Sequence, residues 1–447
     1  MFPFLSRYVL FPLHQRLTDR STLSALDRLR ESQRWTAERL QNWQEESLAR
    51  LLAHASRNVP YYRDLFTREG LDPEFAARNG WARIPLMGKE IVREQFARLQ
   101  AADRPRLFIT GSSSGSTGHP ITWHVDRQAE SVQHAVHIRA REWFGLRLGD
   151  PQFLLWGRDT FQGFRKQLRD FLIWNKRALP GMEITEKSVE IYYKKLRRCR
   201  PRYLRGYPSL FVRFARLCQA RGLSLKDLRV KAVITTAESL SFSQRSEIQA
   251  AYDCPVANEY GCSEVQVIAF ECPKGSMHIQ SDAVRVEFLR EGRPVAPGEF
   301  GEIVVTDLTN QIMPVIRYKT GDIGRPREGS CSCGRTLPLM ELTVGRTVEL
   351  IKLPDGRVVH SEVFTPAHGS FFFKLVRDFH VIQETPARFR VQVVVGHEEE
   401  FHQVRQEYIP FILAQLGEGI EVTIERVTEI PRHSSGKRPY FVSCLEE

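Results

Sequence analysis

An α/β fold followed by a small, separate α+β domain is predicted for this chain of 447 residues. Three observations predict it. From about Leu107 onward, short apolar runs such as QFLLW (152–156) and VKAVITTAES (230–239) alternate with helical patterns. The length exceeds that of one typical core, so two or three domains are expected. Near Gly345 the pattern changes, and new strands surround one helix.

The part of the chain before this α/β region is predicted to be helical. Apolar residues recur at helical spacing between Ser21 and Phe66, and Pro60 breaks the pattern. The first residues, MFPFLSRYVLFPL, are apolar but too short to span a bilayer, and they lack the cleavage site of a signal peptide. We expect them to dock on the protein's own core, with a weak membrane-surface role as the alternative.

Further helices and strands are predicted on both sides of the change at Gly345. SQRSEIQAAY (243–252) predicts a helix, PVANEYGCSE (255–264) a strand ending in a loop, and AVRVEFLREGRPV and FGEIVVTDLT further strands. Beyond Gly345, KLVRDFHVIQET, RFRVQVVVG and GIEVTIERVTEI predict strands around the helix EEEFHQVRQEYIPFILAQLG. We therefore predict a large domain over residues 1–344 and a small one over 345–447.

Composition narrows the possible partners. The net charge of +11 is compatible with nucleic acid, an anionic membrane surface or an anionic small molecule. The basic residues are scattered through helical segments and no nucleic-acid-binding motif joins them, so no nucleic-acid partner is expected. Eight cysteines in so long a chain do not make a disulfide scaffold. With no transmembrane segment, we expect a cytoplasmic protein, either a monomer or a homodimer.

The loop TGSSSGSTGHP (110–120) is dense in glycine and hydroxyl side chains. It is not a Walker A loop, because no Gly-Lys-Ser/Thr follows the glycines. Its backbone N–H groups could close around phosphate oxygens, although a loop of this composition is by itself more often a flexible connector. The residues that would bind phosphate are Ser113, Ser114, Gly115, Ser116, Thr117 and Gly118.

Four more motifs follow this loop in order. EYGCSEV comes directly after a predicted strand, RYKTGDIG contains a tight turn, GRTVEL opens the small domain, and PRHSSGKRP lies near the C-terminus. Each alone is a common turn or dipeptide. Their joint occurrence in this order is a much more specific signal. The residues they contribute are Tyr260, Gly261, Ser263, Glu264, Asp322, Arg346 and Lys437.

With these motifs the chain resembles the adenylate-forming enzymes, which include acyl-CoA ligases, luciferase and peptide-synthetase adenylation domains. Within them it is most similar to the branch of phenylacetate–CoA ligase, coenzyme F390 synthetase and the capsule-biosynthesis protein CapK. The segments LLAHASRNVPYYRDLF, IPLMGKEIV and RPRYLRGYPSLFVRFAR carry the likeness to that branch, and the resemblance covers nearly the whole chain. It implies a large adenylation domain of mixed sheets and flanking helices, then a small, mobile α+β domain.

The resemblance implies an AMP-forming acid–thiol ligase. Such an enzyme uses ATP and Mg²⁺ to convert a carboxylic acid into an acyl-adenylate and pyrophosphate, and then transfers the acyl group to CoA. The loop from Ser113 to Gly118 would wrap the β- and γ-phosphates, Ser263 would donate to a phosphate oxygen, and Glu264 would hold Mg²⁺. Lys437 would bridge the carboxylate and the α-phosphate as the catalytic cation, in a site that must bring two anions together.

The same resemblance assigns the nucleoside. Asp322 would accept both ribose hydroxyls, and Tyr260, followed by Gly261, would stack near the adenine. Ala237 and Glu238, at the end of the strand VKAVITTAES, would also contact the base. Arg346 would lie near the ribose and phosphates at the hinge between the domains.

The acid and the acceptor stay open. WGRDTFQGFRKQLRDFLIWNKRALPGM stands where phenylacetate enzymes have a glycine-rich pocket segment, so a different acid, carried on a larger or anionic molecule, is expected. An amine, a hydroxyl or a carrier protein is the alternative to CoA as acceptor. A scaffold that has lost catalysis is disfavoured by the intact Asp322, Glu264 and Lys437. The CapK likeness suggests polysaccharide or secondary-metabolite biosynthesis, by analogy only.

Three cysteines and one histidine form a candidate zinc site: Cys272, His278, Cys331 and Cys333. Three thiolates and an imidazole suit tetrahedral Zn²⁺. On spacing alone, buried free cysteines are favoured, because the two halves lie far apart and Cys-x-Cys is tighter than usual. The resemblance reverses this preference, since CapK-like members often carry such a set, and it implies a structural Zn²⁺.

Overall fold

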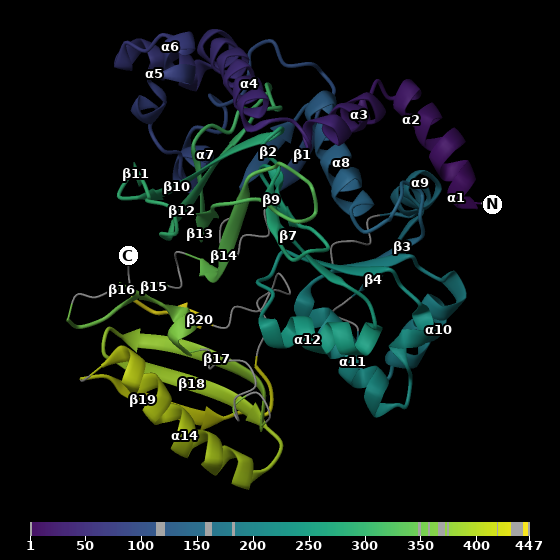
Figure 1. Cartoon of the computed structure of the whole chain (residues 1–447), viewed down its shortest axis with the longest axis vertical. Helices are drawn as coiled ribbons and strands as arrows, with labels where there is room; N and C mark the ends of the chain where they lie inside the picture. Colours follow the sequence, from purple (N-terminus) through teal and green to yellow (C-terminus); the bar gives the residue numbers. More distant parts are fainter. Residues whose placement is uncertain are drawn as a thin grey trace.

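The computed structural model describes residues 2–112, 121–156, 163–180, 184–346, 350–355, 358–364, 372, 375–417, 419–430 and 441–445. The fold is mixed α/β, as expected, with a large unit and a smaller C-terminal sheet below it (Figure 1). One twelve-stranded sheet organises the large unit, and its strands are ordered β11-β10-β12-β13-β14-β9-β8-β7-β6-β5-β3-β4.

Five strands of this sheet form a parallel part, and the other seven are paired antiparallel. The strands β3 to β7 run parallel to one another, and β8 turns back antiparallel to β7. The bounds are β3 Gln152–Trp156, β4 Lys176–Pro180, β5 Tyr203–Gly206, β6 Ala232–Thr236, β7 Val256–Cys262, β8 Gln266–Glu271, β9 Met277–Ile279, β10 Val284–Arg290, β11 Arg293–Pro294, β12 Gly301–Asp307, β13 Tyr318–Arg327 and β14 Leu339–Arg346. A separate hairpin joins β1 (Ile109–Ser112) to β2 (Thr122–Val125).

Helices cover both faces of the sheet (Figure 1). One core packs α10, α11 and α12 on β3, β5 and β6, and a second packs α3 and α8 on the opposite face. The helices are α1 Phe2–Leu5, the π-helical turn η1 Ser6–Leu10, α2 Phe11–Leu17, α3 Thr22–Ser32, α4 Ala37–Asn58, α5 Pro60–Glu69, α6 Pro73–Arg78, α7 Lys89–Glu94, α8 Arg127–Glu142, α9 Phe164–Trp174, α10 Val189–Cys199, α11 Pro208–Ala220 and α12 Phe242–Tyr252.

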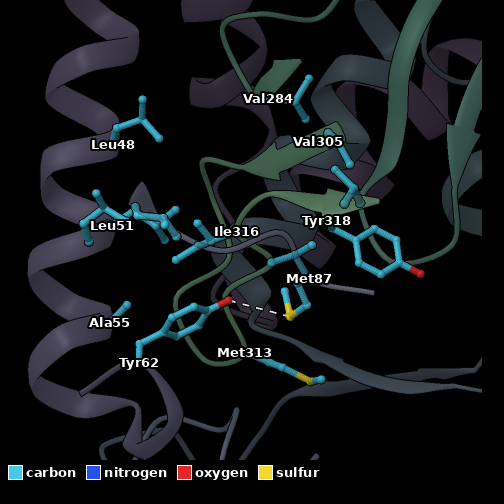
Figure 2. Close-up of a cluster of buried hydrophobic side chains, with 14 of the residues drawn as sticks. Leu48, Leu51, Ala55, Tyr62, Met87, Val284, Val305, Met313, Ile316 and Tyr318 are labelled. Carbon is cyan, nitrogen blue, oxygen red and sulfur yellow. Dashed lines mark hydrogen bonds between the residues drawn. The ribbon is translucent and has the colours of Figure 1, made fainter. Parts of the chain in front are cut away.

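A third core fills the space between α4 and the antiparallel strands (Figure 2). Leu48, Leu51 and Ala55 repeat at helical spacing along α4 and are almost completely buried. Each fully buried leucine contributes about 1.5–3 kcal/mol. The hydroxyl of Tyr62, from α5, donates to the carbonyl oxygen of Pro314 at 3.0 Å. This core therefore fixes the helical N-terminal part on the strands that carry the site.

The C-terminal part forms its own sheet, in the order β19-β18-β17-β20, with α14 packed against it. Alternate residues of β18, from Phe389 to Val395, are buried, and α14 buries Val404, Tyr408, Ile412 and Leu416. A short ribbon of β15 and β16 precedes this sheet. The bounds are β15 Leu350–Lys352, β16 Val358–His360, β17 Val376–Thr385, β18 Arg388–Val395, α14 Glu398–Leu416, β19 Glu421–Arg426 and β20 Phe441–Ser443.

The helical N-terminal region is more divided than its pattern suggested. The stretch from Ser21 to Phe66 folds as three helices, because Thr36 accepts a hydrogen bond from the backbone N–H of Arg39 and starts a new one. Pro60 ends α4 as expected, but it also starts α5, since proline suits the first turn of a helix. Among the described residues, no helix has both the length and the apolar composition needed to cross a bilayer.

Candidate active site

The residues predicted to bind nucleotide lie where the sheet changes from parallel to antiparallel. In open α/β sheets, ligands bind beyond the carboxyl ends of the parallel strands. β6 ends at Thr236 and β7 ends at Cys262, so Ala237 and the segment from Tyr260 to Glu264 lie at this edge. The strand predictions at 230–239 and 255–264 placed both segments correctly.

Tyr260 and Asp322 are in direct contact, although they are 62 positions apart. The Tyr260 hydroxyl donates to the Asp322 carboxylate at 3.0 Å and lies 3.3 Å from the hydroxyl of Thr320. Burial, reinforced by the charge of Asp322, raises the pKa of Tyr260 well above its usual range, so the phenol stays a donor. The structure thus brings together the predicted adenine-stacking and ribose-binding residues.

Gly261 and Glu264 shape the turn that follows Tyr260. A Cβ atom at Gly261 would lie 1.9 Å from the carbonyl oxygen of Gln266, so only glycine fits this close approach of the two strands. Glu264 is buried and accepts a hydrogen bond from the Tyr318 hydroxyl at 3.0 Å. Ser263 is exposed beside it. The predicted magnesium ligand therefore has a fixed position at the edge of the site.

Ala237 and Glu238 continue the end of β6. Ala237 has a φ of 66°, a left-handed conformation that alanine rarely adopts and that is often found at functional sites. The Glu238 carboxylate accepts hydrogen bonds from the backbone N–H of Ser209 at 3.2 Å and from its hydroxyl at 3.1 Å, near the start of α11. The Glu238 side chain thus anchors the turn to a helix.

Some predicted residues lie outside the described part of the chain. These are the phosphate-loop residues Ser113, Ser114, Gly115, Ser116, Thr117 and Gly118, and also Lys437. For Arg346 only the backbone is described, and it pairs with Asp322 in the ladder between β13 and β14. Arg346 is therefore adjacent to the predicted ribose-binding carboxylate.

Sequence reasoning missed a buried ionic triad beside Tyr260. Glu259, the preceding residue on β7, lies 2.5 Å from the guanidinium of Arg205 on β5 and 3.3 Å from Nδ1 of His137 on α8. The Arg205 guanidinium also lies 5.6 Å from the ring centre of Trp156, at the end of β3. The one local signal was a glutamate inside a strand that otherwise reads as buried.

The members of this triad shift one another's pKa values. Burial by itself would raise the pKa of Glu259, but Arg205 and His137 outweigh it and hold that pKa well below its usual range. Burial lowers the pKa of His137, against the opposing effect of Glu259. The carboxylate is therefore ionised under ordinary conditions, and the guanidinium of Arg205 balances its charge.

The three cysteines and the histidine of the candidate zinc site come together in space. All four ligand atoms lie within 4.8 Å of one another. The Sγ atoms of Cys272 and Cys331 are 3.6 Å apart, and Sγ of Cys333 is 3.3 Å from Nε2 of His278. A tetrahedral zinc with its usual bond lengths would separate its ligands by about 3.5–3.8 Å. Pairing of β9 with β14 brings the two halves of the cluster together.

The chemistry of His278 and Cys331 also suits a metal. Burial lowers the pKa of His278 to about 4, so the imidazole is neutral, and its Nδ1 lies 3.2 Å from the carbonyl oxygen of Leu337. Burial would raise the pKa of Cys331, but hydrogen bonds from Ser276 and the backbone N–H of Cys333 bring it down to about 7. A neutral imidazole and a readily ionised thiol are the forms that bind Zn²⁺.

Comparison with known proteins identifies relatives of this chain. Residues 351–443 match the family model of the CapK C-terminal domain. A phenylacetate–coenzyme A ligase of Thermus thermophilus is 29% identical over 310 residues, which is 67% of this chain and 68% of the relative. Protein CapK of Staphylococcus aureus is 23% identical over 273 residues, or 60% of this chain and 59% of the relative.

Solved structures of other proteins share the fold of this chain. A 2-hydroxyisobutyryl-CoA ligase in the postadenylation state superposes with a TM-score of 0.76 at 17% identity, over 92% of this chain and 90% of that one. An anthranilate CoA ligase in complex with anthranoyl-AMP superposes with a TM-score of 0.53 at 16% identity, over 73% of this chain and 65% of that one. The chain therefore has the fold of the adenylate-forming CoA ligases. Within that fold it is a homologue of the phenylacetate–coenzyme A ligases and CapK, and the expected resemblance is confirmed.

Proposed function

We propose that this chain is an ATP-dependent ligase that activates a carboxylic acid as an acyl-adenylate and then transfers the acyl group to CoA. The observation that carries the proposal is the contact between Tyr260 and Asp322 at the carboxyl end of β7. It joins the two motifs assigned to the nucleoside, and named relatives of the chain are CoA ligases.

The nucleotide is proposed to lie across the ends of β6 and β7. Asp322 accepts the ribose hydroxyls while Tyr260, which donates to it, holds its carboxylate in place. The backbone at Ala237 and Glu238 borders the base. Arg346 lies near the ribose and phosphates, and Gly261 and Ser263 border the phosphates. Glu264 would hold the Mg²⁺ that accompanies ATP, a hard cation that prefers oxygen ligands.

The reaction has two displacements. A carboxylate oxygen attacks the α-phosphorus, a bond to that phosphorus forms, and the bond to the pyrophosphate oxygen breaks. A thiolate then attacks the acyl carbon, and AMP leaves with the electron pair. The loop 113–118 and Lys437 would offset the charge of the first step. CoA is the proposed acceptor, with an amine, a hydroxyl or a carrier protein as the alternative.

The acid is proposed to bind near Trp156 and Arg205. These residues stand at the carboxyl ends of β3 and β5, on the same edge as the nucleotide residues. Arg205 is paired with Glu259, but a guanidinium has five N–H donors, and those that remain favour an acid that carries a second polar group. This supports an acid other than phenylacetate. The biosynthetic setting, including polysaccharide synthesis, is suggested only by the likeness to CapK.

Pyrophosphate release tests this function directly. A panel of carboxylic acids is incubated with ATP and Mg²⁺, with and without CoA. For the acid that is turned over, Asp322→Ala is expected to raise the KM for ATP by about 10- to 100-fold, because a charge-assisted hydrogen bond contributes about 1.5–3 kcal/mol. Glu328→Ala, which removes an exposed carboxylate just beyond β13, should change nothing. An unaltered KM in Asp322→Ala would contradict the assigned ribose contact.

A structural zinc ion is proposed at Cys272, His278, Cys331 and Cys333. The support is the convergence of the four ligand atoms and the burial around them. The neighbouring loop also binds the N-terminal helices, since Thr336 donates from its hydroxyl to the carbonyl oxygen of Trp35 at 2.6 Å. The ion would therefore fix the sheet to the segment between α3 and α4.

Metal analysis tests the zinc site. Protein purified without chelator is expected to contain about one zinc per chain. Cys331→Ser should lose it and lower the free energy of unfolding by at least about 2 kcal/mol, while the KM for ATP stays the same. Cys444→Ser, at an exposed cysteine outside the cluster, is the control. Metal-free wild-type protein of full stability would rule the site out.

A further inference from the structure

Residues 2–17 form a helical rod that is docked on the large unit along one side. Ser6, Phe11 and Gln15 of this rod are buried. The Ser6 hydroxyl donates to the carbonyl oxygen of Ile173 at 2.8 Å, and the ring of Phe2 stacks on Phe171 at 4.8 Å. Figure 1 shows α1 and α2 beside α9 at the periphery of the molecule. The expected docking onto the protein's own core is thus present, but it involves only one side of the rod.

Specific contacts hold the rod in place. Arg7 donates to the carbonyl oxygen of Leu148 at 2.7 Å and to the carboxylate of Asp150 at 3.1 Å. A Cβ atom at Gly149, whose φ is 82°, would lie 2.8 Å from the carbonyl oxygen of Pro3. The backbone of the rod therefore approaches a glycine more closely than any other residue would allow. These contacts fix which side of the rod faces solvent.

The solvent side of the rod is largely apolar, although it also carries the exposed side chain of Arg16. Leu17 is 77% exposed, Phe4 65%, Tyr8 57% and Leu13 50%. On the adjacent helix α9, Phe164 is 76% exposed. Of the thirteen large apolar side chains that are exposed in the described part of the chain, eight belong to the rod or to α9: Phe4, Leu5, Tyr8, Val9, Leu13, Leu17, Phe164 and Leu168. Apolar side chains gathered in this way mark an interaction surface.

Basic side chains of α9, together with Arg20, form a border beside the exposed apolar residues of α9. Arg165, Lys166 and Arg169 lie on α9 between and beside Phe164 and Leu168, and with Arg20 they surround a cavity of about 610 Å³. Ile109 and Glu130 complete its lining, and Glu130 is paired with Arg20. Arg169 is paired with Asp170, which also binds Lys176. Four cations around a cavity with one acidic side chain in its lining make this border positive.

We propose that the rod, residues 2–17, and α9 together dock this protein on the surface of an anionic lipid bilayer. A helix that lies in the membrane interface needs an apolar face to enter the acyl boundary and basic side chains to meet the headgroups, and the rod and α9 supply both. A symmetric contact with a second copy would bring the same basic side chains together, which is unfavourable. The charge at the border thus favours lipid over self-association.

Vesicle binding tests the proposal with the full-length chain. Sedimentation is measured with vesicles of phosphatidylcholine alone and with vesicles containing phosphatidylserine, at low and at physiological salt. Binding is expected only to the anionic vesicles and should weaken as salt rises. Tyr8→Ser combined with Leu13→Ser and Leu17→Ser should weaken partitioning by at least about ten-fold. Arg165→Gln with Lys166→Gln should weaken it by about five-fold for each charge removed.

A matched control shows whether vesicle binding depends on the exposed face of the rod and α9 or on any exposed apolar side chain. Phe75→Ser with Ile191→Ser and Phe242→Ser removes exposed apolar side chains from α6, α10 and α12 and should leave partitioning unchanged. Equal binding to neutral and anionic vesicles, or full binding by the Tyr8 triple variant, would overturn the proposal. So would a dimer, measured by light scattering, that this triple variant converts to a monomer. Thermal melting of each variant confirms that it is folded.

Discussion

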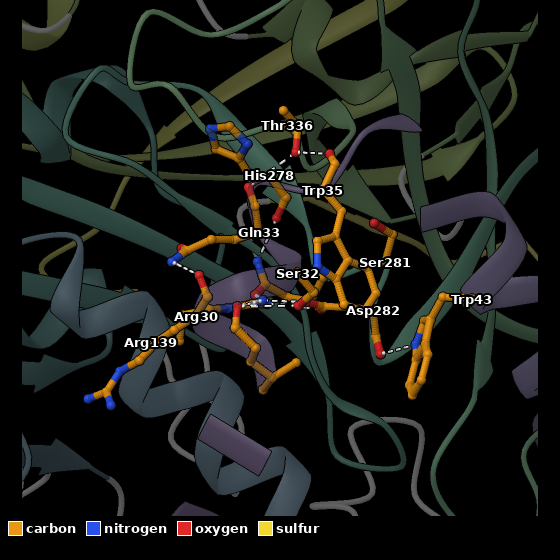
Figure 3. A network of polar contacts seen from close by, with 12 residues as sticks. Arg30, Ser32, Gln33, Trp35, Trp43, Arg139, His278, Ser281, Asp282 and Thr336 are labelled. Carbon is orange, nitrogen blue, oxygen red and sulfur yellow. Dashed lines mark hydrogen bonds and ion pairs between the residues drawn. The ribbon is translucent and has the colours of Figure 1, made fainter. Parts of the chain in front are cut away.

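Asp282→Ala is expected to lower the free energy of unfolding by about 3–5 kcal/mol, because it leaves a buried guanidinium without a counter-charge. The side chains of Asp282 and Arg139 are 2% and 0% exposed. Both carboxylate oxygens of Asp282 accept hydrogen bonds from Arg139, one of them at 3.0 Å, and the hydroxyl of Ser32 donates to the carboxylate at 2.5 Å (Figure 3). One carboxylate thus holds α3, α8 and the turn after β9 together.

Arg139 makes two more contacts, and these increase the loss of stability expected for Asp282→Ala. It donates to the carbonyl oxygen of Leu29 at 2.9 Å and to the side chain of Gln280 at 2.5 Å. Without Asp282 these neutral acceptors cannot balance the buried charge. Replacing both members of the pair by apolar residues, as in Arg139→Met with Asp282→Leu, should destabilise less than Asp282→Ala alone, since no charge is then left buried.

Urea unfolding measures these differences. Glu421→Ala is the matched control, because it removes the partner of Arg388 from a pair whose side chains are 60% and 54% exposed. It is expected to cost less than about 1 kcal/mol. If Asp282→Ala stayed within about 1 kcal/mol of the wild type, or if the double variant were as unstable as the single one, the pair would not have the role assigned to it.

Lys437→Ala is expected to lower the rate of pyrophosphate release by about 100- to 1000-fold, the usual effect of removing one group that stabilises a transition-state charge. The prediction rests on the motif PRHSSGKRP, because Lys437 lies outside the described residues. Affinity for ATP should change little, since the base, the ribose and the outer phosphates are assigned to other residues. Thiolester formation from a synthetic acyl-adenylate should also continue.

Arg438→Ala is the control for this experiment. It removes the adjacent positive charge and should leave the adenylation rate within a few-fold of the wild type. Isotope exchange between pyrophosphate and ATP isolates the first half-reaction, and direct nucleotide binding shows whether affinity is kept. A Lys437→Ala variant that adenylates at nearly the wild-type rate would refute the assignment of the lysine.

Local elements were predictable where one buried face sets the pattern. The apolar run at 152–156 coincides with β3, and the helix predicted over 398–417 is found at 398–416, because in both segments one buried face sets the apolar spacing. The union of twelve strands into one sheet was not predictable, since pairing such as that of β9 with β14 joins segments about sixty residues apart. The division at residue 344 stays a prediction.

The site was predictable as a set of motifs, and much less so as a geometry. Tyr260 and Asp322 were assigned to one nucleoside, but nothing in the sequence indicated that they would touch. The triad of His137, Arg205 and Glu259 draws one residue from each of three elements, so no spacing revealed it. Magnesium, CoA and the roles of the individual residues stay predictions.

The contact between Tyr260 and Asp322 also says how the large sheet is shaped. β7 and β13 are separated in the sheet by β8, β9 and β14, so in a flat sheet they would lie roughly 19 Å apart. Two side chains and one hydrogen bond cannot span that distance, and the sheet must therefore curl back on itself. A nucleotide bound by residues of both β7 and β13 would connect the two strands across this curl. Its binding would suppress local opening of the whole arc from β7 to β13, including the cysteine cluster, so that substrate and metal would protect the same cooperative unit.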